Sequence, residues 1–260
     1  MLSSLTAPSA SRNLHLLHQL VRRDFAARFT GSALGLGWAV LQPLTLVVLY
    51  WFVFTFMIPQ GPGARDNGYV LFLIAGLVPW IGFNEGLMRS TTSIVDNATI
   101  VRRLAFRSEL LVVVPNASAI IFELIGITLF LIFLAATRFV SPMLWVLPFA
   151  ILLQFAIQVG AGWFLAALYV FFRDLAQILG FVLSIVFYLS PILYPVSHRF
   201  ESFFLWNPLT PLLGLFRSAM IGAALPPAVS IVSLVIVAAL IFSGGLTFFR
   251  RAQATLADLV

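Results

Sequence analysis

Long apolar runs separated by short polar segments dominate the hydrophobic pattern of this 260-residue chain. A helix needs about 20 mostly apolar residues to cross the hydrocarbon core of a bilayer, so intervals of that length with few or no charges are candidate spans. Six such intervals predict transmembrane helices, at residues 33–58, 69–88, 110–137, 143–170, 175–194 and 227–249. The pattern predicts an all-α polytopic membrane protein whose single membrane domain covers residues 1–260.

The segment before the first predicted span has a different pattern. Residues 12–30 form a predicted helix on which the apolar side chains share one arc and the polar ones lie roughly opposite; the arc contains Leu14, Leu17, Val21, Phe25 and Phe29. Such a helix lies in the membrane interface with its arginines near anionic headgroups. We expect an amphipathic helix at the cytoplasmic surface, as a topology anchor or as a functional element.

Residues 200–224, before the last predicted span, are apolar but interrupted by Pro208, Pro211 and Gly214. Prolines this close together remove backbone donors and end helices. Two short helices that re-enter the membrane surface therefore fit this segment better than a seventh span.

Residues 91–107 form the longest polar connection and are expected to face the cytoplasm. This segment nevertheless contains more apolar residues than a solvated connector needs, namely Ile94, Ile100, Val101, Leu104 and Phe106. A short amphipathic helix with exposed apolar side chains is typical of a docking surface for a partner protein. A charged loop that fixes the topology is the simpler alternative.

The composition excludes a soluble fold, because only 9% of the residues are charged and 61% are hydrophobic, whereas soluble domains are about one quarter charged. With six spans and both termini in the cytoplasm, eleven of the 15 arginines lie inside, and Arg65, Arg138, Arg199 and Arg217 lie outside. This asymmetry follows the positive-inside rule. The net charge of +6 is therefore interpreted as a topology signal and not as a nucleic-acid-binding surface.

Every basic residue is arginine, so the chain contains no P-loop lysine and cannot hydrolyse ATP by that mechanism. It has no cysteine, and its three histidines, His15, His18 and His198, are too scattered for a zinc site. We expect no catalytic residue, no metal site and no cofactor bound by this chain, which predicts a transport subunit and not an enzyme.

Aromatic residues suggest where a cargo passes. They are dense in the first span, around Tyr50, Trp51 and Phe54, and recur in the fifth span as Phe181, Phe187 and Tyr188. Aromatic faces can stack on the apolar faces of sugar rings, which would suit a carbohydrate conduit. Phenylalanine also covers lipid-facing surfaces, and tryptophan and tyrosine form interface belts, so lipid contact is the alternative.

Taken in order, several segments resemble the ABC-2 type transport permeases, specifically the membrane subunits that export O-antigen, teichoic acid and related polysaccharides. The amino-terminal matches are Arg23-Asp24, Arg28, residues 32–38 and Gln42-Pro43. The carboxy-terminal matches are Phe171 to Leu175, Gln177-Ile178, Ser190 to Pro195, and Asn207 to Pro211 with Arg217. One departure is Arg107, where relatives often have proline.

This resemblance implies a homodimer of six-helix subunits in the bacterial inner membrane, working with two copies of a separate ABC ATPase that binds the ATP and Mg²⁺. It implies a lipid-linked polysaccharide as cargo. It places the coupling to the ATPase on Asn97, Arg102, Arg103, Phe106 and Arg107, and an interface or gate role on Arg23, Asp24 and Arg28.

Three alternatives remain at this point. An ion-coupled carrier would use intramembrane acids as relays, and Glu85 and Glu123 are candidates, although Glu85 lies near the predicted cytoplasmic end. Another ABC-2 exporter, for a drug or a lipid, would have the same architecture. A membrane glycan transferase needs an acidic, metal-binding pair, which Asp96, Glu109 and Asp174 do not obviously form.

Overall fold

The computed structural model describes residues 9–57, 68–99, 108–196, 204 and 207–259. All regular elements among these residues are helical. The longer ones are α1 (Ser9–Ala27), α2 (Trp38–Phe52), α3 (Gly68–Asp96), α5 (Glu109–Ala136), α6 (Leu147–Phe171), α7 (Leu175–Leu189), α9 (Leu209–Ile221) and α10 (Ala228–Leu259). Short helical turns, η1 (Gly35–Gly37), η2 (Val53–Met57) and η3 (Leu144–Val146), extend α2 and α6.

Four helices are long and apolar enough to cross a membrane: Gly68–Asp96, Glu109–Ala136, Leu144–Phe171 and Ala228–Gln253. Three shorter apolar helices accompany them, at Trp38–Phe52, Leu175–Leu189 and Leu209–Ile221. The all-α membrane architecture is therefore confirmed, and the count of six spans stays a prediction.

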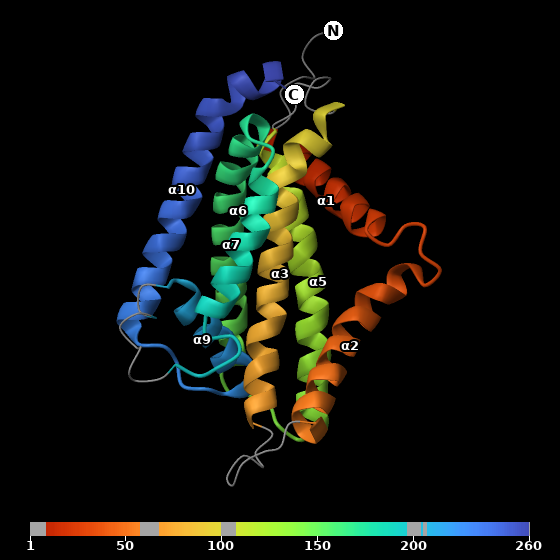
Figure 1. Cartoon of the computed structure of the whole chain (residues 1–260), viewed down its shortest axis with the longest axis vertical. Coiled ribbons are helices and arrows are strands. Elements are labelled where there is room, and N and C mark those ends of the chain that lie inside the picture. The colour runs from red at the N-terminus through yellow and green to blue at the C-terminus, as the bar shows by residue number, and fades with distance from the viewer. Residues whose placement is uncertain (1–8, 58–67, 100–107, 197–203, 205–206, 260) are drawn as a thin grey trace.

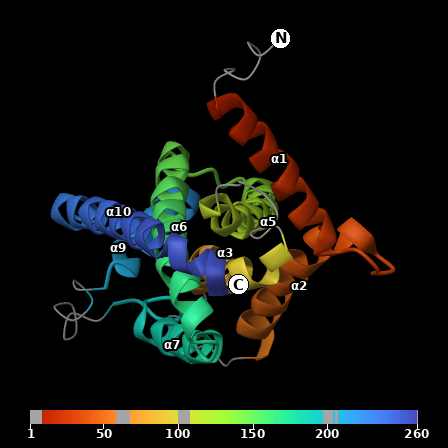
Figure 2. The same cartoon turned by 90° about the horizontal axis from the view of Figure 1, so that it is seen from above.

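Helix α3 is the centre of the bundle (Figures 1 and 2). Helices α5, α6 and α7 surround it, α10 packs along α6, α1 lies across one end, and α2 leans away from the other helices. Burial follows this arrangement, because 72% of the apolar window of α3 is buried and only 17% of that of α10 is. The outer helices therefore present their apolar side chains to the membrane or to another protein.

Glycines allow α6 and α10 to pack with their backbones in contact. A Cβ atom on Gly160 would lie 2.6 Å from the carbonyl oxygen of Ile241, and one on Gly245 would overlap the backbone of Gly160. Small residues let membrane helices approach closely where hydrophobic exclusion from water is unavailable as a driving force. The pair Gly160 and Gly245 therefore fixes the register of these two helices.

Helix α3 continues to Asp96, eight residues beyond the predicted span 69–88. The first part of the predicted loop 91–107 is therefore helical. Its hydroxyl side chains are satisfied within the helix: Thr91 donates to the carbonyl of Leu87 at 2.8 Å, and Ser93 donates to that of Ser90 at 2.7 Å. Polar residues that bond their own backbone in this way can continue a buried helix.

Other boundaries also differ from the sequence prediction. Helix α2 begins at Trp38, after a glycine-containing turn, and not at residue 33. The helix α1 overlaps the predicted range 12–30. Within the predicted re-entrant range 200–224 the structure describes one helix, α9, and residues 200–203 and 205–206 lie outside the described residues.

Candidate functional site at the junction of α1 and α3

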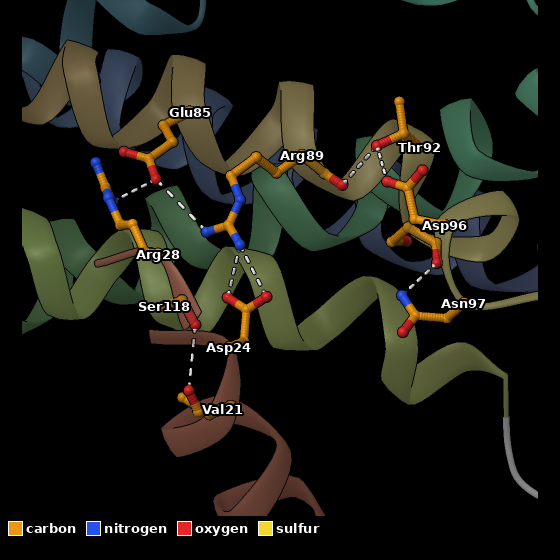
Figure 3. A network of polar contacts seen from close by, with 10 residues as sticks. Val21, Asp24, Arg28, Glu85, Arg89, Thr92, Asp96, Asn97 and Ser118 are labelled. Carbon is orange, nitrogen blue, oxygen red and sulfur yellow. Dashed lines mark hydrogen bonds and ion pairs between the residues drawn. The ribbon is translucent and has the colours of Figure 1, made fainter. Parts of the chain in front are cut away.

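Two ion pairs connect the amino-terminal helix to the central helix (Figure 3). Asp24 accepts hydrogen bonds from Nη2 of Arg89 at both carboxylate oxygens, each at 2.8 Å. Arg28 forms an ion pair with Glu85. Asp24 lies in the last turn of α1 and Arg28 directly follows that helix, whereas Glu85 and Arg89 lie one turn apart in α3. The four charges sum to zero.

The two ion pairs share their charges. Nη1 of Arg89 also lies 3.5 Å from Oε1 of Glu85, which connects both pairs into one network. The side chains are 17% to 33% exposed, so they are screened less than charges at a free surface. Charge-assisted hydrogen bonds in such positions contribute roughly 1–3 kcal/mol each. The network therefore fixes the position of α1 against α3.

Arg28 is held by aromatic rings as well as by charge. Its guanidinium carbon lies 3.9 Å from the ring centroid of Phe122 in α5 and 5.4 Å from that of Phe29. Phe29 is buried and packs with Phe122 and Ala39 in a small apolar cluster. A guanidinium with an aromatic face on one side and a carboxylate on the other is matched by arginine better than by lysine.

A polar cavity of about 230 Å³ lies beside this network. Helices α1, α3 and α5 enclose it, and its polar lining includes Arg23, Asp24, Arg89, Thr92, Asp96 and Asn97. Of the three predicted gate residues, Asp24 and exposed Arg23 thus line this cavity. Arg28 instead pairs with Glu85 beside it. The cavity gives α1 polar contact with the part of α3 that leads into the predicted coupling segment.

The carboxy-terminal end of α3 has its own hydrogen bonds (Figure 3). Thr92 donates to Oδ2 of Asp96 at 2.6 Å, and the side-chain amide of Asn97 donates to the carbonyl of Ser93 at 2.8 Å. Asn97 therefore caps α3. The other predicted coupling residues, Arg102, Arg103, Phe106 and Arg107, lie outside the described residues.

Comparison with known proteins identifies the family. Residues 15–221 match the family described as ABC-2 type transporter. The chain belongs to the ABC-2 transporter family. The match includes α1 from residue 15 onward, the charge network and α9.

Several curated relatives match four fifths or more of the chain. The O-antigen export system permease protein RfbA of Myxococcus xanthus is 27% identical over 94% of this chain and 95% of its own length. The protein of the same name from Klebsiella pneumoniae is 26% identical over 81% of this chain and 82% of its own length. The polysialic acid transport protein KpsM of Escherichia coli is 22% identical over 90% and 92%.

The predicted conduit residues of this ABC-2 chain lie on α2, η2 and α7. In α7, Phe181 and Tyr188 are 69% and 63% exposed, whereas Phe187 packs against Trp80 of α3 with ring centroids 5.7 Å apart. Two of the three α7 aromatics thus face outward from the isolated chain. Phe187 is instead part of the contact between α7 and α3.

The predicted conduit residues Tyr50 and Trp51 of α2 are half-buried. Tyr50 and Trp51 pack against the buried apolar cluster whose members come mainly from α3 and α9. Trp51 also contacts Phe56 edge-on, with ring centroids 5.6 Å apart. The structure does not describe the side chain of Phe54. Which of these residues line a path for cargo stays a prediction.

Sequence reasoning missed a buried polar cluster between α3, α5 and α6. The side-chain amide of Gln154 donates to Glu123, and that of Gln158 donates to the carbonyl of Gly82 at 2.9 Å. A Cβ atom at Gly82 would collide with the Glu123 carboxylate. The spacing of the two glutamines, one helical turn apart in an otherwise apolar run, is the signal that could have revealed a polar stripe.

The acids are distributed among separate contacts. Glu85 belongs to the network with α1, Glu123 bonds to Gln154, and Glu109 accepts from Nε of Arg250 in α10 at 2.9 Å. Within the described parts of the chain, no group of three or more histidine, aspartate or glutamate residues is placed to hold a metal ion. The described site thus offers charge coupling between helices.

Proposed function

We propose that this chain is the membrane permease subunit of an ATP-driven exporter that moves a lipid-linked polysaccharide, similar to O-antigen, across the bacterial inner membrane. The observation that carries the proposal is the similarity to O-antigen export permeases over 94% of the chain. The lack of lysine supports it, because a chain without a P-loop needs a separate subunit to hydrolyse ATP.

The proposed assembly is a homodimer of six-span subunits with both termini in the cytoplasm and one ATPase subunit below each permease. The arginine asymmetry of the sequence supports this orientation. Large apolar side chains on α2 and α7, among them Leu44, Val48, Phe181 and Ile185, are exposed in the isolated chain. Such faces suit a second copy, a cargo path or lipid.

The charge network suggests how ATP hydrolysis reaches the spans. In this proposal the ATPase contacts residues 91–107 and the cytoplasmic side of α1. A displacement of the end of α3 then moves α1 with it, because Asp24 bonds to Arg89 and Arg28 bonds to Glu85. This coupled movement of α1 and α3 would open the bundle on the side where α2 lies and admit the cargo.

A deletion of the gene in its native host tests the function. We expect the surface polysaccharide to disappear and its lipid-linked form to accumulate on the cytoplasmic side of the membrane, and we expect the wild-type gene to restore export. An unchanged surface polysaccharide would exclude polysaccharide export, and export that continues without the partner ATPase would instead support an ion-coupled carrier.

The location of the ATPase contact is tested separately by replacing Arg102 and Arg103 with glutamate. We expect the double variant to insert into the membrane normally but to lose co-purification with the ATPase, because the charge of the proposed docking segment is reversed. Arg138→Glu, an exposed arginine on the side expected to face away from the ATPase, is the matched control. Normal co-purification of the double variant would contradict the placement.

A further inference from the structure

A buried arginine lies in α9 at the end of the molecule opposite α1 (Figure 1). Arg217 is only 6% exposed. Its Nε donates to the carbonyl of Phe72 at 3.2 Å, and its Nη2 donates to the carbonyl of Ile192 at 3.1 Å. Its guanidinium carbon lies 3.5 Å from the ring centroid of Phe72.

The charge of Arg217 has no acidic partner within ion-pair distance among the described residues. A guanidinium has five N–H donors, and the protein's two carbonyl contacts use only some of them. Burying a cation among neutral groups is unfavourable unless an anion accompanies it. The structure nevertheless makes room for this side chain, since a Cβ atom on Gly76 would lie 2.6 Å from Nη2.

Arg217 lines a cavity of about 310 Å³. The lining from α9 consists of Thr210, Pro211, Gly214 and Arg217, which recur at the spacing of one helix face. The hydroxyl of Thr210 is buried and has no hydrogen-bond partner among the described residues. A cation and an unused hydroxyl thus line the same cavity, on the same face of one helix.

The remaining lining of the cavity is mostly apolar. It includes the ring of Phe72 and four prolines from the segments on either side of α9, which are Pro191, Pro195, Pro226 and Pro227. Walls of this kind suit a hydrocarbon chain and offer little to a hydrated free ion. A ligand with an anionic head and an apolar tail matches both parts of the lining.

We propose that this cavity binds a phosphate-bearing lipid, with a phosphate oxygen accepting hydrogen bonds from Arg217 and Thr210 and the hydrocarbon chain lying along the prolines. The planar guanidinium is suited to bind phosphate oxygens in pairs. If the lipid is the carrier of the exported glycan, the site holds its phosphate on the side away from the ATPase; only that assignment rests on the proposed function.

Lipid binding to the full-length purified chain in detergent tests the site, measured by native mass spectrometry. The probes are a polyprenyl diphosphate, phosphatidylglycerol, inorganic phosphate, and the polyprenol without phosphate. We expect at least one phosphate-bearing lipid to bind about tenfold more tightly than the polyprenol. Preference for the polyprenyl diphosphate identifies the carrier lipid as ligand, and preference for phosphatidylglycerol identifies a bilayer phospholipid.

Two variants and one control connect that binding to the cavity. Arg217→Gln is expected to weaken phosphate-lipid binding about tenfold, and Thr210→Val about threefold, whereas exposed Arg138→Gln leaves it unchanged. If Arg217→Gln does not fold, Thr210→Val decides alone, because the Thr210 hydroxyl makes no hydrogen bond to any residue in the described part of the chain.

Wild-type binding in Thr210→Val and in any folded Arg217→Gln would overturn the site. Equal binding of inorganic phosphate and of phosphate-bearing lipid would overturn the role of the apolar walls. The measurement requires neither the ATPase nor transport, so its failure is distinguishable from a failure of the proposed export function.

Discussion

Arg89 and Arg217 lie in different parts of the same bundle, and their charges are compensated in different ways. Arg89 is about one third exposed and pairs with two carboxylates, Asp24 and Glu85, in a network without net charge. Arg217 is almost fully buried, and its contacts in the protein are two carbonyls and one aromatic ring. The charges of the first arrangement balance within the chain, whereas Arg217 has no acidic partner among the residues that the structure describes.

This difference indicates what each end of the molecule does. A neutral, internally paired network connects two helices and needs no ligand, so it suits the transmission of movement from α1 to α3. A buried charge without an internal counter-ion gains stability from an external anion. The α1 end is therefore interpreted as a coupling element, and the α9 end as a binding site.

Reversing one charge of the Asp24–Arg89 network is expected to have the largest effect. Asp24→Arg places three guanidinium groups together, and we expect it to destabilise the protein by roughly 2–3 kcal/mol and reduce export at least tenfold. Thermal unfolding in detergent and surface polysaccharide measure the two effects.

The double variant Asp24→Arg with Arg89→Asp is the control, because it restores the opposite charges in exchanged positions. We expect it to recover at least half of the lost stability and most of the export. Recovery no better than that of the worse single variant would show that the two residues do not act as a pair.

A smaller change breaks the Arg217 site without touching its charge. In Gly76→Ala the new Cβ would lie 2.6 Å from Nη2 of Arg217, so the guanidinium must shift, and we expect a loss of about 1–2 kcal/mol in unfolding free energy. Gly68→Ala in the same helix meets nothing within 4 Å and is the matched control. Equal unfolding temperatures for both variants would contradict the close contact.

A lysine at position 28 separates the contribution of charge from that of the aromatic contact. Arg28→Lys keeps the charge opposite Glu85 but removes the planar group stacked on Phe122 at 3.9 Å. We expect a loss of about 1 kcal/mol, measured by thermal unfolding, and little change in export. A lysine variant as stable as the wild type would assign the whole contact to charge.

The smallest effect is expected at Glu123, which belongs to neither arginine site. Glutamine at this position keeps an oxygen that can accept the hydrogen bond from Gln154 and removes the ionisable group. We expect export by Glu123→Gln to stay within about twofold of the wild type, with the stability retained because the acceptor is retained. A severe export defect in a stable variant would favour an ion-coupled mechanism.

The sequence alone predicted the main helices and the family. Long intervals almost free of charge correspond to α3, α5, α6 and α10, because hydrocarbon excludes charged side chains over the length of a span. The span predicted at residues 69–88 ends before Arg89, because that charged residue interrupts the apolar pattern. In the structure that charge is paired with Asp24, and the helix continues.

The functional contacts were less predictable because they join residues far apart in the chain. Asp24 and Arg28 were selected as a motif, but their partners Arg89 and Glu85 are about 60 positions away, and the sequence carries no signal for that pairing. Arg217 was counted among the arginines outside the cytoplasm and as part of the family resemblance. Its burial depends on the space at Gly76 and on the carbonyls of two other segments, which only the folded arrangement brings together.

The most direct measurement of the account is transport in proteoliposomes that contain the purified chain, its partner ATPase and the lipid-linked glycan. We predict that movement of the glycan across the bilayer requires both proteins and ATP, is abolished by Asp24→Arg, and is unaffected when ionophores remove all ion gradients. Glycan movement without the ATPase, or movement that stops when the gradients are removed, would contradict the account.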